Sequence, residues 1–209
     1  MSSSNKLNFF IISAPSGAGK TSLVKALIEK TDGCRAAVSH TTRAKREGEI
    51  EGKDYHFVSE TEFSRIQSRQ GFLESAEVFG HSYGTSFEEA QRILDNGKTL
   101  ILEIDWQGAL QVRNKFAGAQ SIFILPPSLE ALRTRLKTRA QDSEEIVEKR
   151  MQQAIAESSK WTNFDFLIEN NVFDLALESL SQIIHGNGEQ FVREKQVIHL
   201  KDLITNLTN

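Results

Sequence analysis

The sequence contains a single cysteine, Cys34, among its 209 residues. One thiol excludes a disulfide within the chain and a cysteine-rich zinc site, and the histidines show no metal-ligand spacing. No apolar run approaches the length of a membrane span, and the polar stretch Met1–Lys6 is too short for a secretory signal. We therefore expect a cytoplasmic protein with no membrane partner.

The sequence also has little net charge. Its 25 Lys and Arg residues against 28 Asp and Glu residues give a formal charge of −3. This balance argues against a nucleic-acid partner bound through bulk electrostatics, although a local anion site remains open. A chain of this length fits one large domain, or a domain with small insertions, and can bury about 70% of its unfolded surface.

The stretch 9–22 carries the clearest chemistry. An apolar run precedes a glycine-rich loop that ends in Gly19-Lys20-Thr21, and a helical pattern follows at once. Backbone N–H groups of such a loop can surround phosphates, Lys20 can reach the β and γ phosphates, and the Thr21 hydroxyl can ligate magnesium. The strict pattern has glycine six residues before the lysine, where this chain has Ala14. A turn without a ligand is the alternative, which the Gly-Lys-Thr sequence disfavours.

Buried strands alternate with amphipathic helices along the chain. The apolar runs that predict strands lie at 7–13, 99–104, 121–125 and 166–168, and the helical patterns between and after them include 21–30, 129–139 and 173–185. This alternation predicts an α/β fold, a parallel sheet of the P-loop NTPase type with helices on both faces. Ligands should bind at the carboxyl ends of the strands, where the phosphate loop also lies.

Residues 39–95 interrupt this alternation with short strands and helices of their own. The segment 40–54 has almost no apolar side chain but contains Arg43 and Arg46. Arginine can bind a phosphate through two parallel hydrogen bonds, and the Tyr55 hydroxyl could add a third contact. The alternative for the two arginines is a solvated basic turn, and the alternative for Tyr55 is a half-buried aromatic residue.

Three carboxylates stand in or after strand-like stretches. Glu74 lies in a stretch suited to burial, and an acceptor-only group matches the N1–H and N2–H₂ edge of guanine, whereas adenine presents an acceptor there. Asp105 ends an apolar strand, with Glu103 on the same face, and could hold magnesium or its waters. A half-exposed glutamate and a cap on the turn 106–108 are the respective alternatives.

A basic cluster brackets the polar link at 141–144. Arg135, Arg139 and Arg150 could form a flap that excludes water and screens charge on a transferring phosphoryl group. A solvated helix face is the alternative reading of the same residues.

Several of these stretches, in this order, resemble the bacterial guanylate kinase family. The resemblance spans about residues 7–186 and rests on the segments 14–21, 38–46, 52–55, 72–74, 83–85, 104–108 and 124–128. It implies a core made of 7–38, 96–127 and 151–186, a small α+β GMP-binding insertion at 39–95, and a lid at 128–150. It further implies transfer of the γ-phosphoryl group of ATP to GMP, and to dGMP, with Mg²⁺.

The resemblance also implies roles for individual residues. ATP would be bound by Ala14, Pro15, Ser16, Gly17, Ala18, Gly19, Lys20, Thr21 and Asn170. GMP would be bound by Ser39, Arg43, Arg46, Tyr55, Glu74, Tyr83, Thr85, Glu103 and Asp105. Catalysis would fall to Lys20, Arg43, Arg135, Arg139 and Arg150, and Mg²⁺ to Thr21 and Asp105, directly or through water. Asn171 stands where the family has an aspartate, so no role carries over to it.

Two other functions fit parts of the sequence. A non-catalytic module of the scaffold type would use the insertion to bind phosphorylated peptides, but such modules tend to lose phosphate-loop residues that are intact here. A kinase for another small acceptor is opposed only by the base-reading residues. The tail 187–209 is predicted to be helical, and its apolar positions could pack on the core or support a homo-oligomer, which is a hypothesis.

Overall fold

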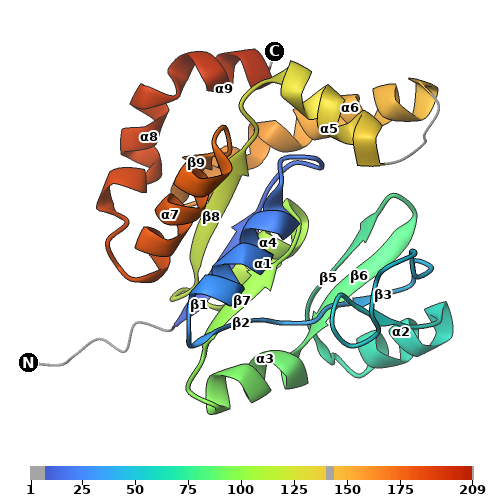
Figure 1. Cartoon of the computed structure of the whole chain (residues 1–209). Helices are drawn as coiled ribbons and strands as arrows, with labels where there is room; N and C mark the ends of the chain where they lie inside the picture. The colour runs from blue at the N-terminus through green and yellow to red at the C-terminus, as the bar shows by residue number, and fades with distance from the viewer. Residues whose placement is uncertain (1–7, 140–143, 209) are drawn as a thin grey trace, which may run out of the picture. The chain divides into compact units, whose positions relative to one another are not determined.

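The structure is a computed structural model, and it describes residues 8–139 and 144–208 (Figure 1). Leu7, the first residue of the predicted core, lies outside the described residues, as does part of the predicted lid, 140–143. Arg139 ends a helix, but its side chain is likewise outside what is described.

The chain divides into two compact units, which are described separately. The first unit contains Met1–Phe10 and Gly33–Ala119, and the second contains Ile11–Asp32 and Gln120–Asn209. The first unit thus groups the predicted insertion 39–95 with the segment that follows it. The boundaries of the core, the insertion and the lid stay a prediction from the sequence.

The larger sheet is parallel and flanked by helices, as the alternation of the sequence predicts. Its strand order is β2-β7-β1-β8-β9. In the first unit β2 (Cys34–Ala36) pairs in parallel with β7 (Thr99–Glu103). In the second unit β8 (Gln120–Leu125) pairs in parallel with β9 (Phe166–Glu169). β1 (Phe9–Ser13) begins in the first unit and ends in the second, and all its residues are buried.

The smaller sheet belongs to the first unit and has the order β4-β3-β6-β5. Its antiparallel pair β5–β6 turns through Phe79 and Gly80, whose φ angles of 53° and 74° are those of a tight two-residue hairpin turn. Figure 1 shows β3 beside this hairpin. The strands are β3 (His40–Thr41), β4 (His56–Phe57), β5 (Phe72–Val78) and β6 (His81–Ser86).

The helices of the first unit begin at side-chain caps. Ser59 accepts a hydrogen bond from the backbone of Glu62, and Ser86 accepts one from Glu89. Each bond satisfies a backbone N–H group that has no partner within its helix. These helices are α2 (Glu60–Ser68), α3 (Phe87–Asp95) and α4 (Trp106–Lys115).

The second unit carries the helix that follows the phosphate loop and the elements of the C-terminal half. Its helices bury apolar stripes, such as Leu23, Val24 and Leu27 of the first of them. The elements are α1 (Lys20–Lys30), α5 (Leu129–Arg139), α6 (Glu144–Ser158), η1 (Ser159–Asn163), α7 (Phe173–Ile184), η2 (Glu189–Phe191), α8 (Arg193–His199) and α9 (Lys201–Thr208).

The tail packs on its own chain. Ile204 and Leu207 of α9 are buried, and α9 contacts α6 and α8. Ile198 remains largely exposed. The burial of these apolar positions within the chain leaves the homo-oligomer hypothesis without support.

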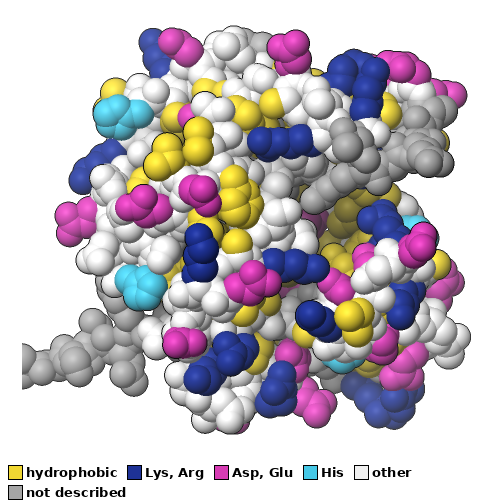
Figure 2. Space-filling view, in the orientation of Figure 1, with side chains coloured by type: hydrophobic (Ala, Val, Ile, Leu, Met, Phe, Trp, Pro, Cys, Tyr) yellow, Lys and Arg dark blue, Asp and Glu magenta, His cyan; other side chains and the backbone are white. Residues whose placement is uncertain are grey.

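The surface mixes charges of both signs. On the face in Figure 2, basic and acidic side chains are interspersed, in line with the small net charge. Within 8–139 and 144–208, none of the helices combines the length and the apolar character that a membrane crossing requires.

Candidate active site

The phosphate loop of the second unit has the strand–loop–helix order that its sequence predicts. β1 ends at Ser13 and α1 begins at Lys20. Gly17 and Gly19 have φ angles of 88° and 94°, in the left-handed region that only glycine adopts without strain. Ala14 is not among the described residues with positive φ, which explains why alanine can replace glycine there. The helix N-terminus and the preceding N–H groups make this loop suitable for an anion.

Two side chains from the C-terminal half donate hydrogen bonds to the same backbone carbonyl of the loop, that of Ala18. The amide nitrogen Nδ2 of Asn170 donates to the Ala18 oxygen at 2.7 Å, and Arg135 Nη1 donates to the same oxygen at 3.3 Å. Arg135 Nη2 also donates to the backbone carbonyl oxygen of Asn170 at 3.1 Å. A Cβ atom at Gly19 would lie 2.3 Å from Asn170 Nδ2, so only glycine fits there. The predicted ATP-side residues Arg135 and Asn170 therefore meet at the loop.

The remaining predicted residues of the ATP side lie on helices of the same unit. Lys20 and Thr21 open α1 and are half-buried, and Arg150 lies half-buried in the middle of α6. Arg139 is the last residue of α5, and its side chain is not described.

In the first unit, Arg43 is paired with a carboxylate that sequence reasoning did not single out. Its guanidinium donates to both oxygens of Glu49, at 2.7 and 3.1 Å. Burial lowers the pKa of Arg43, but hydrogen bonds with Glu49 and Tyr83 outweigh it and raise the pKa overall. The hydrogen bond from Arg43 in turn lowers the pKa of Glu49. No periodicity signals this pair, because both residues lie in a loop without regular structure.

Two tyrosines and a second arginine surround this pair. The rings of Tyr55 and Tyr83 are 5.9 Å apart, edge to face, and the Arg43 guanidinium carbon lies 5.4 Å from the centre of the Tyr55 ring. Burial first, and then the nearby Glu103 carboxylate, raise the pKa of Tyr55 to about 12. Tyr55 therefore keeps its proton, and its hydroxyl can donate a hydrogen bond. Arg46 is exposed at the edge of this group.

Glu74 is buried in β5, with 3% of its surface exposed. A β-bulge between Phe72 and Glu74 breaks the alternation of the strand, so that Leu73 and both its neighbours are buried. Glu74 Oε1 accepts a hydrogen bond from the Thr85 backbone N–H at 2.8 Å. Burial, and to a lesser degree the Asp105 carboxylate, raise the pKa of Glu74 to about 7, against the lowering effect of Thr85.

The other predicted base-reading residues lie next to this carboxylate. The hydroxyls of Ser39 and Thr85 are within hydrogen-bond distance, 2.9 Å apart. A Cβ atom at Gly108 would lie 2.5 Å from Glu74 Oε2, so the glycine leaves the room that this carboxylate occupies. The structure thus brings Ser39, Glu74 and Thr85 together, and it adds Gly108, which the sequence pattern alone could not assign.

Asp105 caps α4, which was the plainer of the two predictions for it. Its Oδ1 accepts the Gly108 N–H at 2.8 Å, and its Oδ2 accepts a hydrogen bond from Gln107 at 3.1 Å. Glu103 ends β7 two residues earlier and is half-buried. Over the described ranges, no three His, Cys, Asp or Glu residues gather as a metal-binding cluster.

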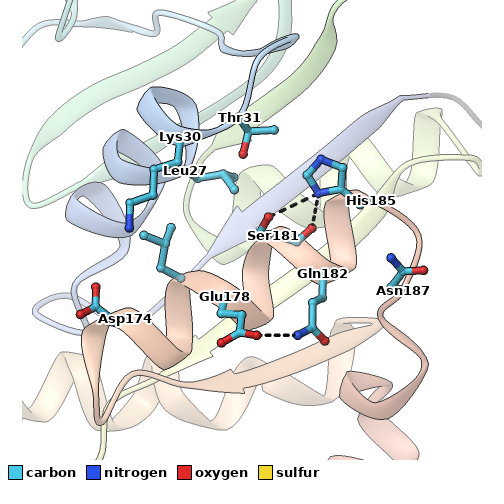
Figure 3. Close-up of a pocket in the computed structure, with 10 residues that line it drawn as sticks. Leu27, Lys30, Thr31, Asp174, Glu178, Ser181, Gln182, His185 and Asn187 are labelled. Atoms are coloured by element: carbon cyan, nitrogen blue, oxygen red, sulfur yellow. Dashed lines mark hydrogen bonds between the residues drawn. The ribbon is translucent and has the colours of Figure 1, made fainter.

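A cavity of about 540 Å³ lies elsewhere in the second unit, between α1 and α7 (Figure 3). None of the predicted site residues lines it. Among the side chains that line it, Gln182 donates to Glu178 at 3.2 Å, and the His185 ring is hydrogen-bonded to the Ser181 carbonyl at 2.7 Å. The cavity is therefore separate from the phosphate loop and from the residues around Glu74.

Comparison with known proteins places these features in one family. A model of the guanylate kinase family matches residues 6–187. The guanylate kinase of Pseudomonas fluorescens strain Pf0-1 is 51% identical over 198 residues, which cover 95% of each chain. That of Methylobacillus flagellatus is 50% identical over 202 residues, which cover 97% of this chain and 99% of the relative. A crystal structure of the guanylate kinase from Anaplasma phagocytophilum is similar with a TM-score of 0.72 and 31% identity, over 94% of this chain and 95% of that one.

Proposed function

This chain belongs to the guanylate kinase family and transfers the γ-phosphoryl group of ATP to GMP, and we propose that its first unit binds GMP and its second unit binds ATP. The observation that carries this assignment is the buried Glu74 carboxylate between Thr85 and Gly108. Burial disfavours the ionised form of this group more than the Thr85 hydrogen bonds favour it. A ligand that donates two hydrogen bonds to it favours the ionised form.

We infer that Glu74 reads guanine. The ionised carboxylate accepts hydrogen bonds from N1–H and N2–H₂, and the Ser39 and Thr85 hydroxyls lie beside it to contact the same base. Adenine would place an acceptor against Glu74 and leave buried polar groups without partners, which is the basis of strong discrimination.

The phosphate of GMP is bound by Arg43, Arg46, Tyr55 and Tyr83 in this proposal. Arg43 presents two parallel N–H donors, whose hydrogen bonds the two oxygens of Glu49 accept. A phosphate offers the same pattern of acceptors with more charge, so it can replace Glu49. Tyr55 contributes a hydroxyl that stays protonated, since its pKa is raised from an already high value to about 12, and it can donate a hydrogen bond.

On the ATP side, the N–H groups of the phosphate loop and Lys20 bind the β and γ phosphates. Asn170 and Arg135 fix the Ala18 carbonyl of this loop by hydrogen bonds. A GMP phosphate oxygen then attacks the γ phosphorus, the bond to the β-γ bridging oxygen breaks, and ADP leaves with that oxygen. No protein nucleophile is needed, because positioning and charge neutralisation supply the catalysis, to which we assign Lys20, Arg43, Arg135, Arg139 and Arg150.

Kinases that use ATP generally need a divalent metal, and we propose Mg²⁺. The Thr21 hydroxyl and the Asp105 carboxylate are hard oxygen donors of the kind that Mg²⁺ prefers. Their small number fits an ion that is held mainly by substrate phosphates and waters. Asp105 already accepts two hydrogen bonds as a helix cap, so contact through water suits it best. When bound, Mg²⁺ neutralises charge on the phosphate oxygens.

An acceptor panel tests the proposal. The purified protein with ATP and Mg²⁺ should release ADP with GMP, and with dGMP, but far more slowly with AMP, CMP or UMP. Equal rates with several acceptors would contradict the role of Glu74, and no rate with any of them would favour the scaffold-type binding module. A cytoplasmic location remains part of the proposal and is tested by fractionating cells that produce the chain.

A further inference from the structure

The Pro15–Ser16 peptide of the phosphate loop is held by hydrogen bonds at both its N–H and its carbonyl. The backbone N–H of Ser16 donates to Glu157 Oε2 at 2.9 Å, and the carbonyl of the same peptide, on Pro15, accepts from the Ala18 N–H at 3.1 Å. The N–H and C=O groups of a trans peptide point in opposite directions. The bond to Glu157 therefore keeps the Pro15 carbonyl turned to the other side, toward Ala18.

Helix stability does not explain Glu157. It lies in the last turn of α6, where the negative end of the helix dipole disfavours a carboxylate. It is nevertheless half-buried, and Gln153, one turn earlier, donates to its other oxygen at 3.3 Å. The side chain is thus held in place to accept the Ser16 N–H.

The same helix pair contacts the next residue of the loop. α5 and α6 share a buried apolar cluster that includes Leu132, Leu136 and Met151. A Cβ atom at Gly17 would lie 3.0 Å from Leu132 and 3.1 Å from Leu136, so the loop lies directly against α5. The α5–α6 pair therefore holds two successive residues of the loop, Gly17 by packing and Ser16 by the hydrogen bond.

We propose that Glu157 is a positioning residue for ATP, which holds the Pro15–Ser16 peptide in the orientation that the phosphates require. This inference rests on the assignment of the loop to ATP. Without Glu157 the peptide can rotate and turn the Pro15 carbonyl, with its partial negative charge, toward the phosphates. Weaker ATP binding with unchanged GMP binding is the specific consequence.

Steady-state kinetics of four variants test the proposal. Glu157→Ala removes the acceptor, Glu157→Asp keeps the charge but shortens its reach, and Glu157→Gln keeps the reach and an acceptor oxygen without the charge. We expect the Ala and Asp variants to raise the KM for ATP about tenfold, equivalent to about 1.4 kcal/mol. The Gln variant should stay within threefold of the unmodified chain, and the KM for GMP should change less than twofold in all. Glu145→Ala, which removes an exposed carboxylate from the same helix, should match the unmodified chain.

The possible outcomes separate cleanly. An unchanged KM for ATP in Glu157→Ala, an Asp variant that behaves like the unmodified chain, or an equal rise of both KM values would overturn the proposal. If Glu157→Ala loses its cooperative thermal transition, the KM for ATP of Glu157→Gln compared with that of Glu157→Asp decides whether the proposal holds. An unmodified chain that transfers no phosphoryl group to GMP contradicts the proposed function itself, whereas an active chain with indifferent variants contradicts only the role of Glu157.

Discussion

In the function proposed here for each unit, phosphate is recognised by different means in the two units. The second unit uses backbone groups, and the peptides of its loop are fixed by outside partners such as Asn170 on Ala18. The first unit uses side chains, among them Arg43, which is paired with Glu49, and Glu74, which is buried with a raised pKa. A backbone cradle binds any chain of phosphates, whereas a set of side chains can choose among bases.

This difference assigns separate tasks to the two units. Changes in the loop should lower the rate with every acceptor by the same factor. Changes around Glu74 should alter the choice of acceptor.

Lys20→Ala should lower turnover about a thousandfold, the scale at which removing one preorganised group for developing charge acts. The overall fold should survive, since the residue lies at the start of α1 and is only half-buried. A coupled assay of ADP release and a thermal melt measure the two properties. Lys30→Ala, at the other end of the same helix and beside the cavity, is the matched control and should leave turnover unchanged. Normal turnover in Lys20→Ala would contradict the assignment of the loop.

Glu74→Ala should reduce the preference for GMP over AMP by about a hundredfold or more, because the hydrogen bonds that separate the two bases are lost. The ratio of kcat/KM for the two acceptors measures this preference. Glu77→Ala, an exposed glutamate on the same strand, should keep it. An unchanged preference in Glu74→Ala would place base recognition elsewhere.

Glu74 should also make the ligand-free protein less stable at high pH. The folded state holds the proton up to about pH 7, while the unfolded chain releases it near 4.5, so the free energy of unfolding falls as the pH rises between these values. The full difference is about 3 kcal/mol. In urea denaturation, the free energy of unfolding of Glu74→Gln minus that of the unmodified chain should therefore increase by about 3 kcal/mol as the pH rises from 4.5 to 8. Equal pH dependence of the free energy of unfolding in both proteins would contradict the raised pKa of Glu74.

GMP binding should weaken about tenfold between pH 8 and pH 6, because only the ionised Glu74 accepts both guanine donors and its pKa is about 7. Calorimetric titration at both pH values measures the affinity. The GMP phosphate also titrates in this range, so Glu74→Gln serves as the reference, and its pH dependence should be clearly smaller. The same slope in both proteins would assign the effect to the phosphate.

Glu49→Gln should have the smallest effect. It weakens the competitor for Arg43, so the KM for GMP should fall about two- to fivefold, the scale of a partly exposed ion pair. The KM for ATP should not change. A rise in the KM for GMP would show instead that Glu49 orients Arg43 for binding.

The sequence predicted the two halves unequally, for a physical reason. The phosphate loop could be predicted from local spacing, since Gly17, Gly19 and Lys20 lie close together in the sequence. The parallel α/β sheet followed likewise from alternating apolar patterns. The acceptor half was read mostly through the family resemblance, and its key contacts join distant residues, such as Glu74 with Gly108. Glu157 lies 141 residues from its partner Ser16, and no local pattern indicates such a contact.

The ratio of kcat/KM for GMP to that for AMP, measured in Lys20→Ala and in Glu74→Ala, tests the division of tasks most directly. We predict that Lys20→Ala lowers both values by the same factor and leaves the ratio unchanged, while Glu74→Ala collapses the ratio. A changed ratio in Lys20→Ala, or an equal loss for both acceptors in Glu74→Ala, would contradict the account.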